Sequence, residues 1–305
     1  MKITVAICTF NRANLLEKTL ERITYAKKPK KLELELLVVN NRCTDSTDDI
    51  INLYSQKLPL TRIYQPVQGL SNARNAAVDA ATGDYILWTD DDVLVSENWL
   101  LAYEEAIIKN QNVAVFGGPV QPWFEEDPPA WISENWELLA SAFATRNLGE
   151  MEIPLNPYKG LTPFGANYCL RMREQSCFLY DSKLGRNGTK TVLGEETEVI
   201  RKIFDTGGSG LWIPNASVQH WIPKNRMQIQ YIADYFQGVG RTQVILNETA
   251  PCKMIAGIPR WKVSQFIKSW TRFHSQRILF GAKNNISTLC ELETLRGEIL
   301  QYREN

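Results

Sequence analysis

Three consecutive carboxylates, Asp90, Asp91 and Asp92, follow an apolar run that ends at Trp88. In an open α/β sheet, ligands bind outside the carboxyl ends of the strands, and divalent cations such as Mg²⁺ prefer oxygen ligands. Carboxylates this close repel one another unless a cation or a proton relieves them. The run therefore predicts a metal site, and the alternative is a solvated acidic turn.

A second acidic group, Glu195 and Glu196, follows Gly194. Adjacent carboxylates tend to raise the pKa of one of them toward the range that suits a general base. We expect Gly194 to free the backbone just before a helix that runs toward Phe204. The alternative is an acidic first helical turn, which the helix dipole favours.

Polar loops follow three expected elements near the N-terminus and could together receive a nucleotide. Their candidate binding residues are Thr9, Asn11 and Arg12 after the first strand, Asn40 and Asn41 after the second, and Gly69 and Arg74 around the start of a helix. Arg74 could reach a phosphate from that helix. Each loop taken singly is also explained as a turn with a helix cap.

One of the two histidines, His220, lies in an expected strand that ends near Pro223. An imidazole there is either a functional group, whose role the family resemblance below suggests, or a histidine whose hydrogen bonds are satisfied in the core.

Short β-type runs alternate with helical patterns through the first third of the chain, which is typical of a parallel sheet with crossover helices. The expected strands are Ile3 to Cys8, Leu34 to Val39, Leu60 to Tyr64, Tyr85 to Trp88 and Val113 to Phe116. The fold class is therefore α/β.

Helix boundaries in this region are predicted from capping residues. Thr44 or Asp45 is expected to cap a helix through Leu53, Ser71 to cap a helix from Asn72 to Ala81 with Gly83 as its stop, and Ser96 to cap a helix from Glu97 to Lys109.

From Gly117 to Trp131 the chain is rich in proline, tryptophan and acidic residues. Proline disfavours both helix interiors and central strands, so we expect an irregular segment. Its tryptophans, Trp131 among them, either fill a core or form a platform for the ring of a ligand.

Beyond Met227 the chain is expected to be mostly helical, through Ile245 and again from Trp261 to the C-terminus. Residues 260–281 combine cations with aromatic side chains, a pattern suited to an anionic membrane surface. Packing against the catalytic domain or a second subunit is the alternative. The basic and aromatic residues are Arg260, Trp261, Lys262, Phe266, Lys268, Trp270, Arg272, Phe273 and Arg277.

The composition excludes several classes of protein. Among 305 residues, 34 Lys and Arg balance 34 Asp and Glu, so no basic field indicates nucleic-acid binding. Six scattered cysteines indicate neither a zinc site nor a disulfide framework, and neither a signal-peptide core nor a membrane span is found. We expect a cytoplasmic protein, peripheral on the inner membrane face if residues 260–281 bind lipid.

Four motifs in order, Thr-Phe-Asn-Arg from Thr9, Val-Val-Asn-Asn from Val38, Gly-Leu-Ser-Asn-Ala-Arg-Asn from Gly69 and Thr-Asp-Asp-Asp-Val from Thr89, resemble the family 2 glycosyltransferases. The resemblance implies the GT-A fold, a Rossmann-like, mostly parallel central sheet flanked by helices, here with a helical C-terminal extension. We expect a catalytic domain over 1–225, with a nucleotide-sugar half at 1–120 and an acceptor half at 121–225, and the extension at 226–305.

The resemblance also implies inverting transfer of a sugar from a nucleotide-diphosphate sugar, by family a UDP-sugar, to a carbohydrate or lipid-linked acceptor. It implies Mn²⁺ or Mg²⁺ held by Asp92 and by Asp91, with Asp90 nearer the ribose and His220 near the metal or the diphosphate. Glu196 matches the family's base, with Glu195 the second choice. Gly165, Ala166 and Asn167 resemble the acceptor and donor-sugar side, and Asn40 departs from the family's Asp.

Two other classes remain as alternatives. A metal-dependent phosphohydrolase would usually carry its nucleophilic carboxylate after the first strand, where this chain has Thr9-Phe10-Asn11. A catalytically silent sugar-binding protein would tolerate loss of the acidic motifs, whereas both are intact here.

Overall fold

We describe the protein from a computed structural model, which covers residues 1–187, 190–247, 252–280 and 285–304. The chain divides into two compact units whose segments alternate along the sequence. The first unit comprises Met1–Trp123, Ala144–Ser182 and Glu195–Trp221, and the second comprises Phe124–Phe143, Lys183–Gly194 and Ile222–Asn305. The boundary expected at residue 225 stays a prediction.

A seven-stranded sheet organises the first unit, in the order β11-β6-β8-β4-β1-β2-β3. Strands β4, β1, β2 and β3 run parallel, and β8 runs antiparallel to both β4 and β6. The strands are β1 (Lys2–Thr9), β2 (Glu33–Asn40), β3 (Leu60–Tyr64), β4 (Tyr85–Asp90), β6 (Val115–Gly117), β8 (Asn167–Arg171) and β11 (Gly210–Trp212). The predicted α/β class with a mostly parallel sheet is confirmed.

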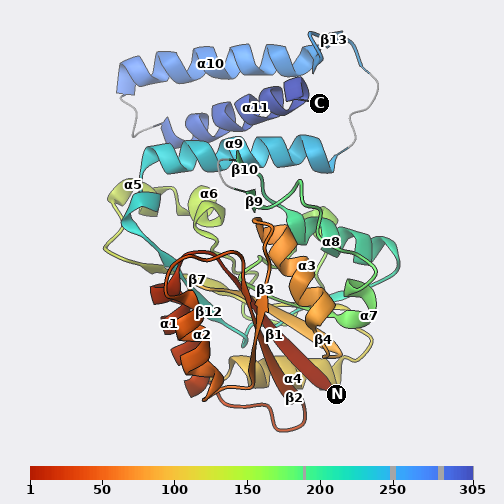
Figure 1. Cartoon of the computed structure of the whole chain (residues 1–305). Helices are drawn as coiled ribbons and strands as arrows, with labels where there is room; N and C mark the ends of the chain where they lie inside the picture. The colour runs from red at the N-terminus through yellow and green to blue at the C-terminus, as the bar shows by residue number, and fades with distance from the viewer. Residues whose placement is uncertain (188–189, 248–251, 281–284, 305) are drawn as a thin grey trace. The chain divides into compact units, whose positions relative to one another are not determined.

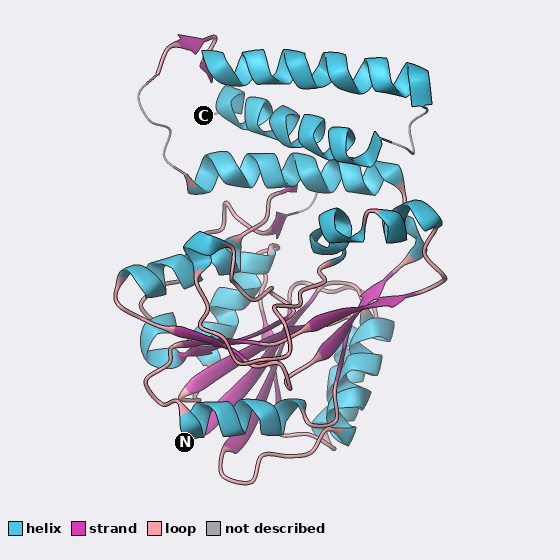
Figure 2. Ribbon diagram, turned by 180° about the vertical axis from the view of Figure 1, so that it is seen from behind, coloured by secondary structure: helices cyan, strands magenta, loops and turns pink. Residues whose placement is uncertain are grey.

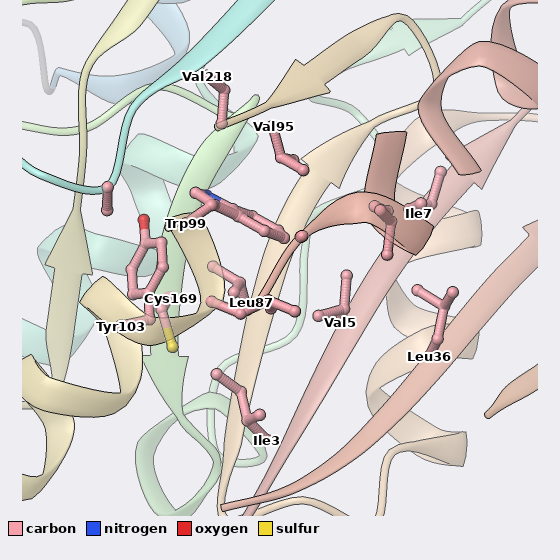
Figure 3. Packing of buried hydrophobic residues seen from close by; sticks show 14 of the residues in the cluster. Ile3, Val5, Ile7, Leu36, Leu87, Val95, Trp99, Tyr103, Cys169 and Val218 are labelled. Carbon is pink, nitrogen blue, oxygen red and sulfur yellow. The ribbon is translucent and has the colours of Figure 1, made fainter. Parts of the chain in front are cut away.

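Helices cover both faces of this sheet, which Figure 2 shows from behind. One face carries α1 (Ala13–Tyr25), α2 (Thr47–Ser55) and α4 (Trp99–Lys109), and the other carries α3 (Leu70–Ala80) and α8 (Glu195–Asp205). Ile3, Val5 and Ile7 of β1 point to the first face, where they pack with Leu36 and Leu87 (Figure 3). Because these strands are buried on both faces, their sequences read as nearly continuous apolar runs.

A second, three-stranded sheet has the order β5-β12-β7 and places residues beside the acidic cluster. Its strands are β5 (Val93–Val95), β7 (Val120–Phe124) and β12 (Val218–Ile222). His220 pairs with Val93 across the antiparallel β5–β12 ladder. The irregular course expected after Gly117 is wrong for Val120–Phe124, because β7 is an edge strand and an edge tolerates Pro122.

The strand predictions agree with the structure to within two residues, but the predicted helix caps do not. The helix α2 begins after Ser46, α3 begins after Gly69 with Ser71 buried inside it, and α4 begins after Asn98. Asp45 still accepts the Thr47 N–H at 3.2 Å, and it also accepts the Ala13 N–H of α1 at 2.9 Å. Tertiary contacts therefore set these helix starts more than local capping does.

Three long helices dominate the second unit: α9 (Ile229–Leu246), α10 (Arg260–Phe280) and α11 (Ile286–Glu304). In this unit α11 lies between α9 and α10 (Figure 1). The helices α5 (Ala130–Glu134) and α6 (Trp136–Leu139) contribute Trp131 and Leu139 to the core of this unit, which also contains Ile232. The predicted helical C-terminal region is confirmed.

Short elements complete the described chain: α7 (Met172–Gln175), the pairs β9 (Arg186–Asn187) with β10 (Lys190–Thr191) and β13 (Met254–Ile255) with β14 (Ile258–Pro259), and single 3₁₀ turns at Ala140–Phe143, Pro157–Lys159 and Lys224–Arg226. Among the helices that the structure describes, none combines the length and the apolar character needed to cross a bilayer.

Candidate active site

The carboxyl ends of β4, β1 and β2 bring the polar loops of the sequence together. Asp90 pairs with Cys8 across the β4–β1 ladder, and Thr9 pairs with Asn40 across the β1–β2 ladder. The loop after β1 is held to the loop after β2, because Asn11 Oδ1 accepts the Thr44 N–H at 2.7 Å. This edge of the sheet is the expected place for a ligand in an open α/β fold.

Arg12 bridges two of the three aspartates at this edge. Its Nη1 lies 3.1 Å from Asp91 Oδ1 and 2.9 Å from Asp92 Oδ2. Asp91 and Asp92 are both buried, so an adjacent cation offsets part of their desolvation cost. Sequence reasoning proposed Arg12 as a nucleotide contact, and the structure places its guanidinium against the acidic cluster.

Three side chains of the cluster offer ligand atoms that could hold a metal. Single ligand atoms of Asp90, Asp92 and His220 lie within 4.8 Å of one another, and His220 Nε2 lies 3.3 Å from Asp92 Oδ1. Two carboxylates and one imidazole form a donor set that suits Mn²⁺, whereas Mg²⁺ prefers oxygen alone. The residues present therefore fit a divalent cation, and the structure brings Asp90 rather than Asp91 into this group.

Three hydrogen bonds that the sequence did not suggest fix the acidic loop. Thr19 of α1 donates its hydroxyl to the Asp91 carbonyl at 2.9 Å and accepts the Val93 N–H at 3.1 Å. The Trp221 N–H donates to the Asp92 carbonyl at 2.9 Å. The loop is thus clamped between α1 and β12. Thr19 lies on the buried, mostly apolar face of α1, so the sequence did not indicate its role.

Burial and the neighbouring Asp92 carboxylate raise the pKa of Asp91 to about 7, although Arg12 lowers it. For Arg12 itself, burial acts to lower the pKa, but Asp91 and Asp92 raise it well above its ordinary value. The cluster therefore carries more negative charge than one guanidinium neutralises, which favours a further cation.

The loop after β2 is held by the two asparagines that the sequence singled out. Asn40 donates to Asp48 Oδ1 at 2.6 Å and accepts the Cys43 N–H at 2.7 Å. Asn41 donates to the carbonyls of Gln65 and Val67 and accepts the Gly69 N–H at 2.9 Å. Both side chains are buried and position the loop and the start of α3. Their contact with a nucleotide stays a prediction.

The two candidate bases lie at the start of α8, and Arg74 pairs unequally with them. Arg74 Nη1 lies 2.8 Å from Glu195 Oε1 and 3.9 Å from Glu196 Oε2. Burial, and next the Glu195 carboxylate, raise the pKa of Glu196 to about 7, while Arg74 lowers it and Asp90 adds a smaller increase. Glu195 is thus tied to a buried cation, and Glu196 has the proton affinity of a base near neutral pH.

Aromatic rings surround the guanidinium of Arg74 at distances typical of cation–π contacts. The ring centroids of Trp88, Tyr168 and Tyr180 lie 5.8, 5.8 and 5.4 Å from its Cζ. Only 3 % of the Arg74 side chain is exposed. The expected reach of Arg74 to a phosphate stays a prediction, since this structure turns the side chain toward the glutamates.

The expected donor-sugar segment lies against this ion pair. A Cβ on Gly165 would come within 2.8 Å of Arg74 Nη2, so glycine permits the close approach of the backbone here. Ala166 is buried, and Asn167 is fully buried. Asn167 accepts from Trp99 and Tyr103 and donates to the carbonyls of Pro119 and Ala216, so all its hydrogen-bonding groups are used within the protein.

The tryptophans of the proline-rich segment have two different environments. Trp131 is buried in the core of the second unit, as the core alternative predicts. In the first unit, Trp123 and Trp221 meet edge to face with centroids 4.6 Å apart, and Lys18 Nζ lies 5.7 and 5.6 Å from them. This half-buried pair lies next to the acidic loop, because Trp221 also donates its N–H to the Asp92 carbonyl. The sequence did not suggest the pair because its members lie far apart in the chain.

Comparison with known protein families identifies the family of this chain. The family model described as glycosyl transferase family 2 matches residues 4–174, a span that includes the acidic cluster and the loops after β1 and β2. The chain belongs to glycosyl transferase family 2. The predicted resemblance and the assignment as a glycosyltransferase are therefore confirmed.

Relatives of this glycosyltransferase cover most of its length. The succinoglycan biosynthesis protein ExoM of Rhizobium meliloti (strain 1021) is 27% identical over 239 residues, which are 76% of this chain and 71% of ExoM. The glucosyl-dolichyl phosphate glucuronosyltransferase of Haloferax volcanii is 25% identical over 252 residues, which are 79% of this chain and 76% of that protein.

Solved structures share the fold of this glycosyltransferase. The mannosyltransferase PcManGT from Pyrobaculum calidifontis, in complex with GDP-Man and Mn²⁺, has a TM-score of 0.58 at 17% identity and covers 98% of this chain and 74% of its own. TarS 1-349 of S. aureus, in complex with UDP-GlcNAc, has a TM-score of 0.59 at 17% identity. The match covers 99% of this chain and 79% of the TarS chain. The predicted GT-A fold is confirmed.

Proposed function

We propose that this glycosyltransferase is a metal-dependent, inverting enzyme that moves a sugar from a nucleotide-diphosphate sugar to a hydroxyl acceptor. The observation that carries the proposal is the pairing of two sites in the first unit. One is a carboxylate–imidazole cluster suited to a cation, and the other is a glutamate whose pKa is raised to about 7 beside a charge-paired neighbour.

Glu196 is the proposed base. Its carboxylate would take the proton of the acceptor hydroxyl as the acceptor oxygen bonds to the anomeric carbon of the sugar. The bond from that carbon to the diphosphate oxygen breaks, and its electron pair leaves with the diphosphate. A single displacement of this kind inverts the anomeric configuration. Glu195 is the weaker candidate because it lies 2.8 Å from Arg74 Nη1.

Asp90, Asp92 and His220 would hold the cation, and Mn²⁺ fits them better than Mg²⁺. A bound cation supplies Lewis-acid neutralisation of charge on the diphosphate. The proposed role of Arg12 is to set the charge of the cluster, since it already neutralises part of Asp91 and Asp92.

The donor is proposed to be a nucleotide-diphosphate sugar, held by the loops after β1 and β2. PcManGT was solved with GDP-Man and TarS with UDP-GlcNAc, so neighbours of the same fold take donors with different bases. A UDP-sugar remains our first choice from the family resemblance.

The proposed acceptor is a carbohydrate or lipid-linked saccharide in polysaccharide or glycoconjugate synthesis. ExoM is named for succinoglycan biosynthesis, and the Haloferax volcanii relative is named a glucosyl-dolichyl phosphate glucuronosyltransferase. We also propose that the protein is cytoplasmic and contacts the inner face of the membrane through residues 260–281.

A thermal-shift panel followed by a transfer assay tests this function. Nucleoside diphosphates and their sugars, each with and without Mn²⁺, should raise the melting temperature where they bind. The best donor should then be hydrolysed slowly and transferred faster to an acceptor, with inversion seen by NMR of the first product. Retention of configuration, or full transfer activity in folded Asp92→Ala and Glu196→Gln variants, would contradict the proposal.

A further inference from the structure

One hairpin in the second unit exposes apolar side chains that contribute little to its core. The hairpin, residues 254–259, buries Ile258 and Pro259 of β14 but leaves Met254 and Ile255 of β13 each 48% exposed. Its turn is tight, with Ala256 at φ 48° and Gly257 at φ 78°. A non-glycine residue is rarely held at positive φ, so the turn costs free energy to keep. The Arg260 N–H donates to the Lys253 carbonyl at 2.9 Å and ties the hairpin to the start of α10.

The helix α10 continues this exposed apolar surface. It packs against α11 along a stripe that includes Phe266, Ser269 and Phe273, while Trp261, Ile267 and Trp270 are 49%, 58% and 46% exposed. Together with the hairpin, five large apolar side chains are exposed within seventeen residues of chain. Exposed apolar clusters of this kind mark interaction sites.

The charge of the same segment has one sign. The sequence contains no Asp or Glu between Glu248 and Glu291, and it contains seven Lys and Arg over that stretch. A two-fold contact of this face with a second copy would place cations against cations, which disfavours a symmetric dimer. An anionic surface with an apolar interior matches both the charge and the exposed tryptophans.

A cavity of about 550 Å³ between α10 and α11 provides a polar pocket beside this surface. Lys262 and Arg272 line it and pair with Glu298 and Glu291 of α11, whereas Lys268 has no acidic partner among the residues that the structure describes. Ser269 also lines it, 3 % exposed, and its hydroxyl has no hydrogen-bond partner within the described chain. The Lys268 ammonium and the unsatisfied Ser269 hydroxyl can both donate hydrogen bonds to the oxygens of a phosphate.

We propose that the hairpin and the outer side of α10 dock on an anionic phospholipid bilayer, with Met254, Ile255 and Trp261 entering the interface. The cavity beside Lys268 then receives a phosphate of a lipid headgroup. This inference deepens the membrane contact proposed above and adds the hairpin, which lies outside residues 260–281. It does not depend on the transfer reaction.

Vesicle sedimentation of the full chain tests the inference. Vesicles of phosphatidylglycerol and phosphatidylcholine in equal parts should carry the protein down, and pure phosphatidylcholine vesicles should not. Raising the salt concentration should release it, because screening weakens attraction to the lipid charge. Free inorganic phosphate should not release it at matched ionic strength if the lipid is the true source of the phosphate.

Matched variants localise the contact. The double variant Met254→Ser, Ile255→Ser should lower the partition coefficient by about tenfold or more, because two apolar side chains no longer enter the interface. The control is the double variant Met151→Ser, Leu53→Ser in the first unit. The side chains of Met151 and Leu53 are 75% and 48% exposed, and this variant should bind vesicles as wild type does. Lys268→Ala should lower binding about fivefold, as expected for one cation near the lipid surface.

Several results would overturn the inference. These are equal binding to both kinds of vesicle, no binding to either, or unchanged binding by the hairpin variant. Concentration-dependent dimerisation that Trp270→Ser abolishes, without vesicle binding, would assign the face to a second copy. Donor hydrolysis measured in solution should be the same in all these variants. Failure of membrane docking is thus distinct from failure of the proposed transferase activity.

Discussion

Arg74 and Glu195 form a buried ion pair, with Arg74 Nη1 2.8 Å from Glu195 Oε1 and both side chains at most 7% exposed. The same nitrogen lies 3.9 Å from Glu196 Oε2. One guanidinium thus compensates one of two adjacent carboxylates closely and the other loosely. This asymmetry gives two adjacent glutamates different environments, and it agrees with the ranking of Glu196 before Glu195 that the family resemblance implies.

Replacing each glutamate by glutamine should separate their roles. Glu196→Gln should lower kcat by about 10²–10⁴, the usual contribution of a general base, without lowering the melting temperature. Glu195→Gln should destabilise the fold by about 3–5 kcal/mol, because it leaves the buried Arg74 charge without its close partner. Steady-state kinetics and chemical denaturation of both variants measure the two effects. The reverse result would make Glu195 the base.

The activity should depend on pH through Glu196. The pKa of this carboxyl is raised to about 7, so the base is lost as pH falls through that value and kcat/KM should fall with it. Arg74 lowers this pKa, so in Arg74→Met the midpoint should move to higher pH, while Arg74→Lys should keep most of the lowering. The groups that face Glu196 here are Glu195, Arg74, Tyr168, Tyr180 and Asp90.

The sign for stability is opposite to that for activity. A carboxyl whose folded pKa is raised binds its proton more tightly in the folded state, so its contribution to stability is lost as pH rises from its unfolded value near 4.5 to about 7. Wild type should therefore lose more stability across this window than Glu196→Gln does. A parallel loss in both proteins would remove Glu196 as the titrating group.

Metal removal should abolish transfer if the cluster holds a catalytic cation. Chelation should stop product formation, and Mn²⁺ should restore it. His220→Ala should weaken Mn²⁺ binding by at least about tenfold in calorimetry, since loss of one of three direct protein ligands should cost no less than loss of an outer-shell partner. The control is His274→Ala, because this histidine packs on Trp270 and Phe273 in the second unit. Transfer that is insensitive to chelators would contradict the metal proposal.

Asn40 stands where the family pattern has an aspartate, and its contact with Asp48 explains the asparagine. Asn40 Nδ2 donates to Asp48 Oδ1 at 2.6 Å. Asn40→Asp would set two carboxylates against each other and should cost about 1–3 kcal/mol of unfolding free energy. The double variant Asn40→Asp, Asp48→Asn restores one donor and one acceptor and should recover most of the loss. A double variant as unstable as the single one would show that this contact does not matter.

The crossing of α9 and α11 depends on two glycines. A Cβ on Gly240 would lie 1.9 Å from the Thr294 carbonyl oxygen, and one on Gly297 would lie 1.9 Å from the Gln237 carbonyl oxygen. Either alanine substitution should lower the free energy of unfolding by about 1–3 kcal/mol, because the helices must move apart. Ser264→Ala on the exposed side of α10 serves as the control and should leave the melting temperature unchanged. Alanine at both glycines without loss would refute the close crossing.

The sequence was sufficient for the features that depend on local pattern. Alternating apolar runs and helical periods predict the α/β class, and the position of Asp90 after an apolar strand predicts its place at the carboxyl edge of the sheet. The helix after Gly194 and the long C-terminal helices are also as predicted. Hydrophobic periodicity encodes these features because each strand or helix must bury its own apolar face.

Only the tertiary structure determined which polar groups meet. The sequence does not show that Arg74 pairs with Glu195 across 121 residues, that Arg12 turns toward Asp91 and Asp92, or that Thr19 clamps the acidic loop. The predicted caps at Ser71 and Ser96 were wrong for the same reason. A hydrogen bond or an ion pair depends on distance and direction between atoms, and chain folding sets these for residues far apart in sequence.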